Sequence, residues 1–351
     1  RLEWAGRRGM VDFPSLYVDY NQGPLLLRVG QQQIAWGQAL FFRVLDVPNG
    51  LDLRRHLFLD YAPEEYADER VASPGVRLTY QLTQSLEMDW FGQMFQPTIY
   101  PNANTPYNAI ASQFTVQDRY SEDYERKWNT GLRLRGQWGA WSSQFIAVRR
   151  YNPDGVFRWT QSGVNRDLGK APGSGALLAQ TAFEVDSTGV VSSEEWFTYA
   201  GNARLNGVTG LNASIRDFAA AQALGAFEVA DMQTAAQELN FFFFLADDPA
   251  TAAPEGLRGH IERRYFRETN LGAGVGYVFS ASPGSLLDQL IVNLEATYTP
   301  GRMFTDQSLR KEFVEDDEVI GALVLEKYQR FSQSFPATYM VFQWMHRTES
   351  D

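Results

Sequence analysis

Residues 25–70 read LLLRVGQQQIAWGQALFFRVLDVPNGLDLRRHLFLDYAPEEYADER, and this stretch changes character halfway along. In residues 25–32, leucine and valine alternate with arginine, glycine and glutamine, which is the pattern of a strand with one apolar face. After Pro48-Asn49-Gly50 the stretch becomes densely charged as far as Arg70. Charges at that density need water or opposite charges around them. The sequence therefore predicts a sheet next to a polar enclosure or open solvent.

Two environments offer this combination: the solvent around a soluble sheet protein, and the water-filled interior of a transmembrane barrel. A chain of 351 residues is long enough for either. No apolar run approaches the roughly 20 residues that a membrane-spanning helix needs, so a helical membrane protein is excluded. The net charge of −11, from 31 basic and 42 acidic residues, argues against nucleic acid as a partner.

Catalytic and metal-binding signals are missing from the sequence. It has no cysteine, and His56, His260 and His346 lie too far apart to have the spacing of a zinc site. No GxSxG, HExxH or phosphate-loop motif occurs, and adjacent carboxylates do not establish the separation that glycoside hydrolysis requires. We therefore expect a protein that is not an enzyme, with no catalytic residues, no metal and no cofactor.

The alternation seen in residues 25–32 recurs along the chain, and short turns alternate with long loops. Outer-membrane barrels have this asymmetry, with turns at one rim and loops at the other. Aromatic residues make up 14% of the chain, which suits membrane-interface girdles but also sugar-binding platforms. We expect the apolar positions of the clearest strands to face lipid: Leu27, Val29, Leu78, Tyr80, Leu132, Leu134, Val275, Tyr277, Val292 and Leu294.

Residues 152–256 interrupt the strand pattern and are predicted to form a partly helical insertion, because so long a connection is rarely structureless. A capping box of Ser192 and Glu195 predicts a helix that Gly207 ends, and Asp231 is expected to cap a second helix.

The insertion also carries four consecutive phenylalanines, Phe241, Phe242, Phe243 and Phe244. They either pack the insertion against its neighbours or form a hydrophobic lid over a substrate surface.

Two further patterns concern the later strands. Gly272, Gly274 and Gly276 share one strand face and lack a dinucleotide-binding context, so they indicate that something inside approaches the strand closely. The acidic run at 315–318 is predicted to be a loop that either holds a divalent cation at a lipopolysaccharide surface or is simply solvated.

The segments GPLLLRVGQQQIAWGQALFFRVLDVPNGLDLRR (23–55) and LDYAPEEYADERVASPGVRLTYQL (59–82) resemble the Gram-negative outer-membrane family known as domain of unknown function 1302. The resemblance implies an outer-membrane β-barrel and a chain that is an interior portion of a longer member, incomplete at both ends. It also implies that the protein acts together with a periplasmic protein and with a resistance-nodulation-division exporter in the inner membrane. No catalytic residues come with it.

We therefore expect an all-β chain with helical insertions, forming over residues 1–351 a single antiparallel transmembrane β-barrel of the outer-membrane type. Its expected function is that of a channel or transporter for hydrophobic or amphipathic small molecules in the outer membrane of a Gram-negative bacterium, in contact with lipid and lipopolysaccharide. The alternative is a soluble, aromatic-rich, glycan-binding β protein.

Residues 43–70 are expected to fold inward as a constriction or plug, because a water-filled barrel accepts charge while its wall supplies opposite charges. The alternative for this segment is a solvated rim loop. We expect the following side chains to line the lumen or the constriction: Arg28, Gln32, Arg43, Arg54, Arg55, Asp60, Glu64, Glu65, Asp68, Glu69, Arg70, Arg77, Glu87, Asp89, Arg133 and Arg135.

Overall fold

The structure is a computed structural model. It describes residues 3–6, 9–13, 15–39, 43–54, 70–101, 108–169, 171–244, 256–332 and 336–348. Its largest element is an antiparallel sheet with the strand order β16-β15-β14-β13-β9-β8-β6-β5-β4-β3. The ten strands are β3 (Leu16–Gln22), β4 (Leu25–Gln32), β5 (Ser73–Thr83), β6 (Leu86–Met94), β8 (Trp128–Trp138), β9 (Trp141–Tyr151), β13 (Arg267–Val278), β14 (Ile291–Phe304), β15 (Val314–Gln329) and β16 (Thr338–Arg347).

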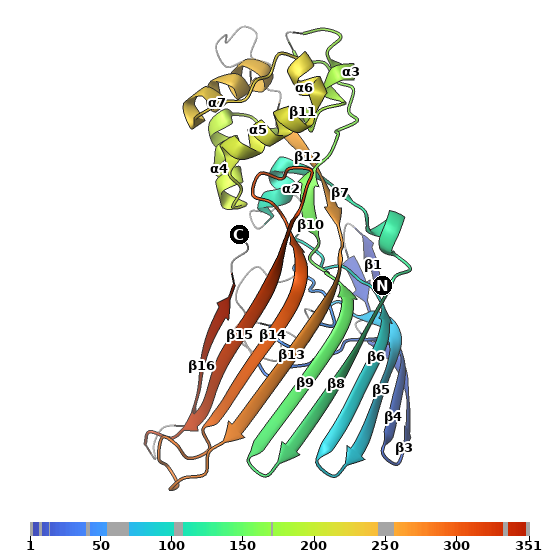
Figure 1. The fold of residues 1–351 in the computed structure, drawn as a ribbon, viewed down its shortest axis with the longest axis vertical. Coiled ribbons are helices and arrows are strands. Elements are labelled where there is room, and N and C mark those ends of the chain that lie inside the picture. The colour runs from blue at the N-terminus through green and yellow to red at the C-terminus, as the bar shows by residue number, and fades with distance from the viewer. Residues whose placement is uncertain are drawn as a thin grey trace.

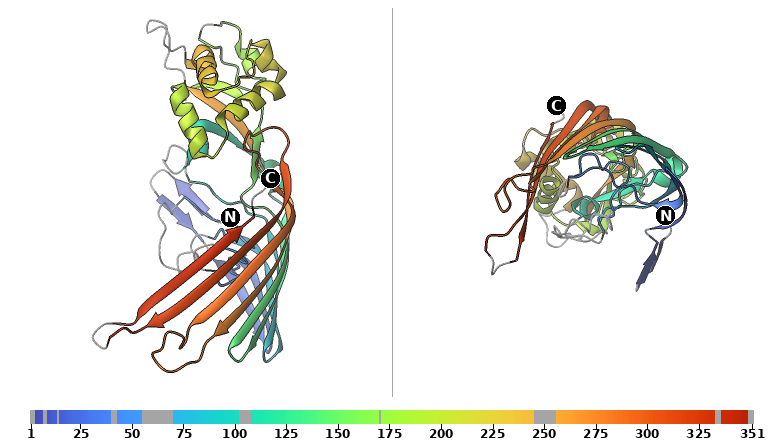
Figure 2. Two further views of the ribbon diagram at one scale, coloured as in Figure 1. Left: turned by 60° about the vertical axis from the view of Figure 1, so that its left-hand side comes forward. Right: turned by 90° about the horizontal axis from the view of Figure 1, so that it is seen from below.

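The large sheet is strongly curved but open (Figure 2, right). Among the described residues, its edge strands β3 and β16 do not pair with each other. The prediction of antiparallel β structure with a few helices is thus confirmed, whereas a closed barrel is not found. Alternation within each strand could not reveal this, because closure depends on how the two edge strands meet.

The two faces of the large sheet differ in polarity, as the alternation predicts. On the convex face, a row of directly paired residues crosses the sheet from β3 to β15 without a charge. It consists of Tyr20, Leu27, Leu78, Trp90, Leu132, Ala147, Leu271, Tyr298 and Val319. The ten positions expected to face lipid all have this parity and are partly or largely exposed. They do not pack into a core between two sheets, so the large sheet is not half of a sandwich.

A smaller region lies at the long-loop end of the large sheet (Figure 1). Its sheet has the order β10-β12-β11, with β7 parallel to β12. Its strands are β7 (Phe114–Asp118), β10 (Val156–Trp159), β11 (Phe183–Val190) and β12 (Leu257–Arg264). The helices are α2 (Ala109–Gln113), α3 (Gly175–Leu178), α4 (Ser193–Asn202), α5 (Gly207–Asp217), α6 (Ala219–Ala223) and α7 (Met232–Leu239), with π-helical turns η1 (Tyr120–Tyr124) and η2 (Asn240–Phe244).

A separate hairpin, β1 (Glu3–Gly6) with β2 (Gly9–Asp12), precedes both sheets. No helix in the described part of the chain is long and apolar enough to cross a membrane.

Both predicted helix caps are confirmed, but the predicted helix end is wrong. The Ser192 side chain accepts a hydrogen bond of 3.1 Å from the Glu195 amide, and Asp231 accepts one of 2.8 Å from the Thr234 amide. Gly207 does not end α4, which stops at Asn202, but begins α5. Glycine suits that position because an added Cβ would lie 2.7 Å from Cδ1 of Phe197.

The phenylalanine tract forms η2 at the end of α7. Phe244 is buried and Phe243 packs against the core of the small region, 5.7 Å between ring centroids from Phe183. Phe242 is half-buried, whereas Phe241 is exposed. The tract thus packs mainly within its own region, and its role as a lid stays a prediction.

Candidate functional site

An irregular segment lies against the concave face of the large sheet (Figure 2, right). We call its described part, residues 33–39 and 43–54, the inner segment. Its apolar side chains Ile34, Trp36, Leu45 and Val47 form a buried cluster with Phe91, Ile146 and Val148 of the sheet wall. Further along the segment, the Gly50 carbonyl accepts a hydrogen bond of 2.9 Å from the amide of Val71, two residues before β5. The described part of the predicted plug, 43–54, therefore contacts the inside of the curved sheet.

The glycines of β13 make room for the inner segment. A Cβ at Gly272 would lie 2.4 Å from Cδ2 of Leu45, and one at Gly274 would lie 3.1 Å from Cδ1 of the same leucine. A Cβ at Gly276 would lie 3.4 Å from Oε1 of Gln38 and closer still to two wall side chains. The expectation that something inside approaches these glycines closely is confirmed.

Polar side chains of the wall hold the backbone of the inner segment. Gln93 donates to the Pro48 carbonyl at 2.7 Å, and Thr297 donates to the Val44 carbonyl at 2.7 Å. Arg150 donates to the carbonyl of Val47. An irregular segment away from water needs such partners because its carbonyls have no ladder of their own.

A buried carboxylate joins the inner segment to the wall between β5, β6 and β8. Asp89 is fully buried and accepts hydrogen bonds from Arg77 at 2.6 Å and from Arg133 at 3.1 Å. It also accepts a bond of 3.0 Å from Nε1 of Trp36 in the inner segment. Glu87 lies 3.6 Å from Arg133 at the edge of this cluster. Two guanidinium groups thus neutralise the charge of Asp89.

A second buried carboxylate, Glu295 of β14, binds the inner segment two residues beyond Trp36. It accepts a hydrogen bond of 3.0 Å from Gln144 of β9 and one from the Gln38 amide. Its Oε2 atom has no hydrogen-bond partner among the described residues. The wall and the inner segment therefore meet at a buried carboxylate on two separate strands, β6 and β14.

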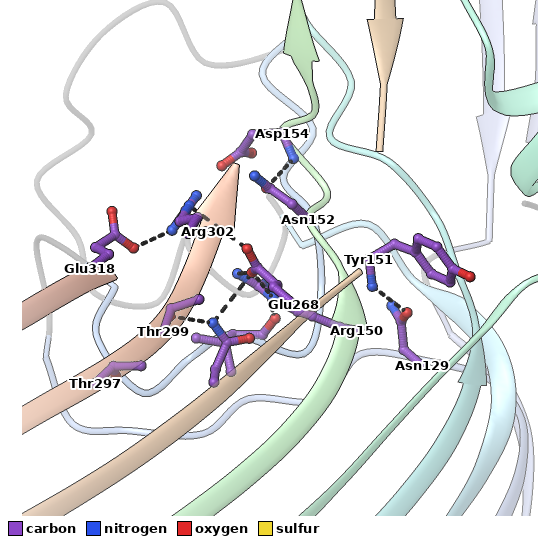
Figure 3. A network of polar contacts seen from close by, with 12 residues as sticks. Asn129, Arg150, Tyr151, Asn152, Asp154, Glu268, Thr297, Thr299, Arg302 and Glu318 are labelled. Atoms are coloured by element: carbon purple, nitrogen blue, oxygen red, sulfur yellow. Dashed lines mark hydrogen bonds and ion pairs between the residues drawn. The ribbon is translucent and has the colours of Figure 1, made fainter. Parts of the chain in front are cut away.

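A chain of alternating charges crosses the sheet near its long-loop end (Figure 3). Arg150 of β9 lies 2.8 Å from Glu268 of β13, and Arg302 of β14 lies 3.7 Å from the same carboxylate. Arg302 and Arg347 of β16 both bind Glu318 of β15, the latter at 2.5 Å. Each of the two carboxylates is thus shared by two arginines, and these ion pairs connect five neighbouring strands through their side chains.

The acidic run at 315–318 is not the predicted loop, because it lies within β15. Glu318 is buried and holds two arginines, while Asp317 accepts hydrogen bonds from the Tyr298 hydroxyl at 2.6 Å and the Gly301 amide at 2.9 Å. Strand alternation sends successive carboxylates to opposite faces, so they do not converge on one cation. Among the described residues, no group of three or more histidines and carboxylates could hold a metal ion.

The remaining predicted lumen residues that the structure describes lie at the concave face or in the inner segment. Arg28 pairs with Asp19 at 2.7 Å, and Gln32 is buried with its amide 3.3 Å from the Gly75 carbonyl.

Within and beside the inner segment, Asp46 binds Arg43 at 3.1 Å and Arg70 at 2.8 Å, and Arg54 binds Asp52 at 2.8 Å. The predicted residues Arg55, Asp60, Glu64, Glu65, Asp68 and Glu69 lie outside the described residues.

Arg135 differs from the other predicted cations because it is exposed. It lines a pocket of about 370 Å³ near the short-turn end, together with Gln38 of the inner segment and Glu326 of β15. Arg133, two residues earlier, is buried in the Asp89 cluster. The two arginines were predicted together, but only Arg135 faces open space.

Four charged residues of the concave face were not predicted from the sequence: Arg150, Glu268, Glu295 and Arg302. Glu318 was predicted only as part of an acidic loop. Strand parity could have found some of them, since Glu295 alternates with the apolar positions of β14 and Arg150 continues the inward parity of Gln144 in β9. Their pairing could not be read in the same way, because it depends on which strands become neighbours.

Taken together, the arrangement offers paired charges on the concave face and an inner segment fitted against it. A family model described as a protein of unknown function (DUF1302) matches residues 10–335 of the chain. Among curated proteins and among solved structures, none matches it.

Proposed function

The chain belongs to the DUF1302 family of proteins of unknown function, and on this premise we propose that it forms wall and plug of an outer-membrane β-barrel. The observation that supports this most is the division of the large sheet into an apolar convex face and a charged concave face. A sheet in a membrane needs this division, since its lipid side must be apolar while its inner side can hold water and charge.

The height of the apolar face supports the same proposal. Trp128 and Trp138 are both exposed and stand ten residues apart at the two ends of β8. At about 3.3 Å per residue they are roughly 33 Å apart along the strand. With a strand tilt of about 40°, this becomes roughly 25 Å, the height of the apolar band between the aromatic girdles of such barrels.

Barrel closure is part of the proposal. Unpaired strand edges are not tolerated in lipid, because each free backbone group costs several kcal/mol there. The free edges of β3 and β16 must therefore be paired in the membrane, either with each other or with strands that the described residues do not supply.

In the proposed barrel, the inner segment acts as the constriction. It occupies the concave face through Trp36, Leu45 and Val47, so a solute must pass beside it or displace it. Hydrophobic or amphipathic small molecules are the proposed cargo, and a periplasmic protein with an inner-membrane exporter are the proposed partners. These two assignments rest on the resemblance of the sequence to the outer-membrane family, and no catalytic step is assigned.

Site-directed spin labelling tests the placement of the sheet. The chain has no cysteine, so single cysteines can be introduced one by one at positions 292–297 of β14 without background labelling. After reconstitution into liposomes, labels at 292, 294 and 296 should collide with dissolved oxygen, which concentrates in lipid. Labels at 293, 295 and 297 should be shielded from it, so they serve as internal controls on the same strand.

The alternative function, a soluble glycan-binding β protein, makes the opposite prediction. The protein would then stay in solution without detergent, and labels at 292, 294 and 296 would be fully accessible to a water-soluble nickel chelate. Binding to a glycan array under those conditions would replace the barrel proposal.

A further inference from the structure

Four cationic side chains surround one pocket in the small region, outside the large sheet. The pocket has a volume of about 240 Å³ and is lined by Arg119, Arg158, Arg264 and Lys311, with Glu262 as the lining carboxylate. Arg119 follows β7, Arg158 lies on β10, and Glu262 and Arg264 lie on β12. Lys311 precedes β15, so four segments far apart in the sequence bring positive charge to one place in a chain whose net charge is −11.

Glu262 is the internal counter-ion of the pocket. It is buried, and its carboxylate lies 3.1 Å from Nε of Arg119 and 3.0 Å from Nε of Arg264, and it also binds Nε of Arg158. Burial alone would raise the pKa of Glu262, but the hydrogen bonds from Arg158 and Arg119 hold it below its ordinary value. One negative charge is thus shared by three guanidinium groups.

The other acceptors around the pocket do not balance the remaining charge. Arg119 also binds Glu122 on its solvent side, while Arg158 donates from Nη1 to the Lys311 carbonyl at 2.9 Å. Lys311 donates from Nζ to the Asp217 carbonyl, which is neutral, and its backbone amide donates to the Asp217 carboxylate at 3.1 Å.

Arg264 has the fewest partners. Its Nε is buried without a hydrogen bond of suitable geometry, and its terminal nitrogens have no acceptor among the described residues.

We propose that this pocket binds a phosphate-type oxyanion. Guanidinium groups present pairs of N–H donors that match the oxygens of a phosphate. Such donors are free here: Nη2 of Arg119 and Nη2 of Arg158 have no acceptor among the described residues, and neither have the terminal nitrogens of Arg264. Lys311 adds a point charge at the pocket wall, 4.5 Å from the ring centroid of Phe218. The group has two possible sources, a free phosphate and the phosphate of a lipid headgroup, and the site itself does not depend on the placement of the large sheet in a membrane.

Calorimetric titration of the purified, detergent-solubilised protein tests the site. Inorganic phosphate is titrated at constant ionic strength in a buffer without phosphate or sulfate, because exposed charges respond to salt. We expect saturable binding that weakens at least tenfold in Arg264→Gln and in Lys311→Gln. Arg310→Gln is the matched control, since it removes the same charge from an exposed neighbour that pairs with Asp306 outside the pocket.

A second titration with phosphatidic acid in mixed micelles separates the two sources. Tighter binding of the lipid at equal phosphate concentration assigns the site to a headgroup, and equal or weaker binding assigns it to free phosphate. Thermal unfolding in the anion-free buffer checks that each variant is folded. If Arg264→Gln does not fold, Arg264→Lys keeps the charge without the paired donors and should still weaken binding. The proposal is overturned if neither anion binds saturably, or if the pocket variants bind as tightly as the control.

Discussion

Nε1 of Trp36 donates a hydrogen bond of 3.0 Å to Oδ2 of Asp89, the carboxylate that Arg77 and Arg133 also bind. The same oxygen thus serves the sheet wall and the inner segment at once. The Trp36 ring also packs edge-on against Phe91, with 5.2 Å between ring centroids. Because the wall neutralises Asp89, the indole needs to supply only a donor and apolar surface to anchor the segment.

Replacing Trp36 by Phe should loosen the inner segment without disturbing the wall. Phenylalanine keeps an aromatic contact with Phe91 but lacks the donor, and a hydrogen bond to a charged group contributes about 1.5–3 kcal/mol. Amide hydrogen exchange should therefore become faster in peptides from residues 33–50 and stay unchanged in β8 and β9. Trp90→Phe on the convex face is the matched control. Equal exchange in Trp36→Phe and the unsubstituted protein would show that the indole does not anchor the segment.

Adding a side chain at Gly272 should push the inner segment away from β13. A valine there would overlap Leu45, whose Cδ2 would already lie 2.4 Å from a Cβ, and overpacking of this kind costs typically about 1–3 kcal/mol. Ala273→Val adds bulk at the next residue, which faces outward and is exposed, and should cost little. Thermal unfolding compares the two variants. A similar loss of stability in both would mean that the glycine face is not shaped by the segment.

The comparison of Gly272 with Glu268 shows how far the sequence could predict this site. Three glycines of one parity require a close neighbour whatever that neighbour is, so local pattern was sufficient to predict the contact. The partners of Glu268 are Arg150 and Arg302, which lie on strands adjacent to β13. In the sequence, β9 is separated from β13 by residues 152–266, so the pairing is a property of the assembled sheet. Whether the edge strands β3 and β16 pair with each other likewise depends on the assembled sheet, and the pattern within one strand does not show it.

Local chemistry also explains the correct and the incorrect helix boundaries. Ser192 and Asp231 act through the first turn of their own helix, and that interaction is visible in the sequence. Gly207 can either end one helix or begin the next, and the side chain of Asn206 decides between them by accepting a hydrogen bond of 3.0 Å from the Thr209 amide. The glycine alone therefore does not show whether a helix ends or begins at residue 207.

Charge reversal at Arg135 should change ion selectivity in the proposed barrel more than any change at Arg133. Arg135 is exposed and lines the 370 Å³ pocket, so Arg135→Glu alters the field along a wet passage without breaking a buried pair. Reversal of the buried Arg133 would instead leave Asp89 short of a cation, and breaking a buried pair costs about 3–5 kcal/mol. Reversal potentials in planar bilayers measure the selectivity. An unchanged reversal potential in a correctly folded Arg135→Glu variant would place the passage elsewhere.

Glu238 of α7 should make the stability of the small region depend on pH. Its carboxyl group is buried, Oε1 accepts a hydrogen bond of 2.8 Å from the Phe227 amide, and Oε2 has no hydrogen-bond partner among the described residues. Burial raises the pKa of Glu238, although the bond from Phe227 opposes the rise. The folded form therefore holds its proton more tightly than the unfolded chain does.

The sign of the effect follows from this difference in proton binding. The folded state is most favoured below the unfolded pKa of a glutamate, about 4.3. Stability then falls as the pH rises from that value through the raised pKa, because the carboxylate must ionise with no cation paired to it among the residues that the structure describes.

Glu238→Gln keeps an oxygen for the Phe227 amide and cannot ionise, so its stability should be nearly independent of pH in this window. Hydrogen exchange of peptides from α4 to α7 at several pH values, corrected for intrinsic exchange rates, would reveal the difference. Glu228→Gln, a change at an exposed glutamate, is the control and should keep the pH dependence of the unsubstituted protein. If Glu238→Gln kept the same pH dependence, burial of Glu238 would not be the source of that dependence.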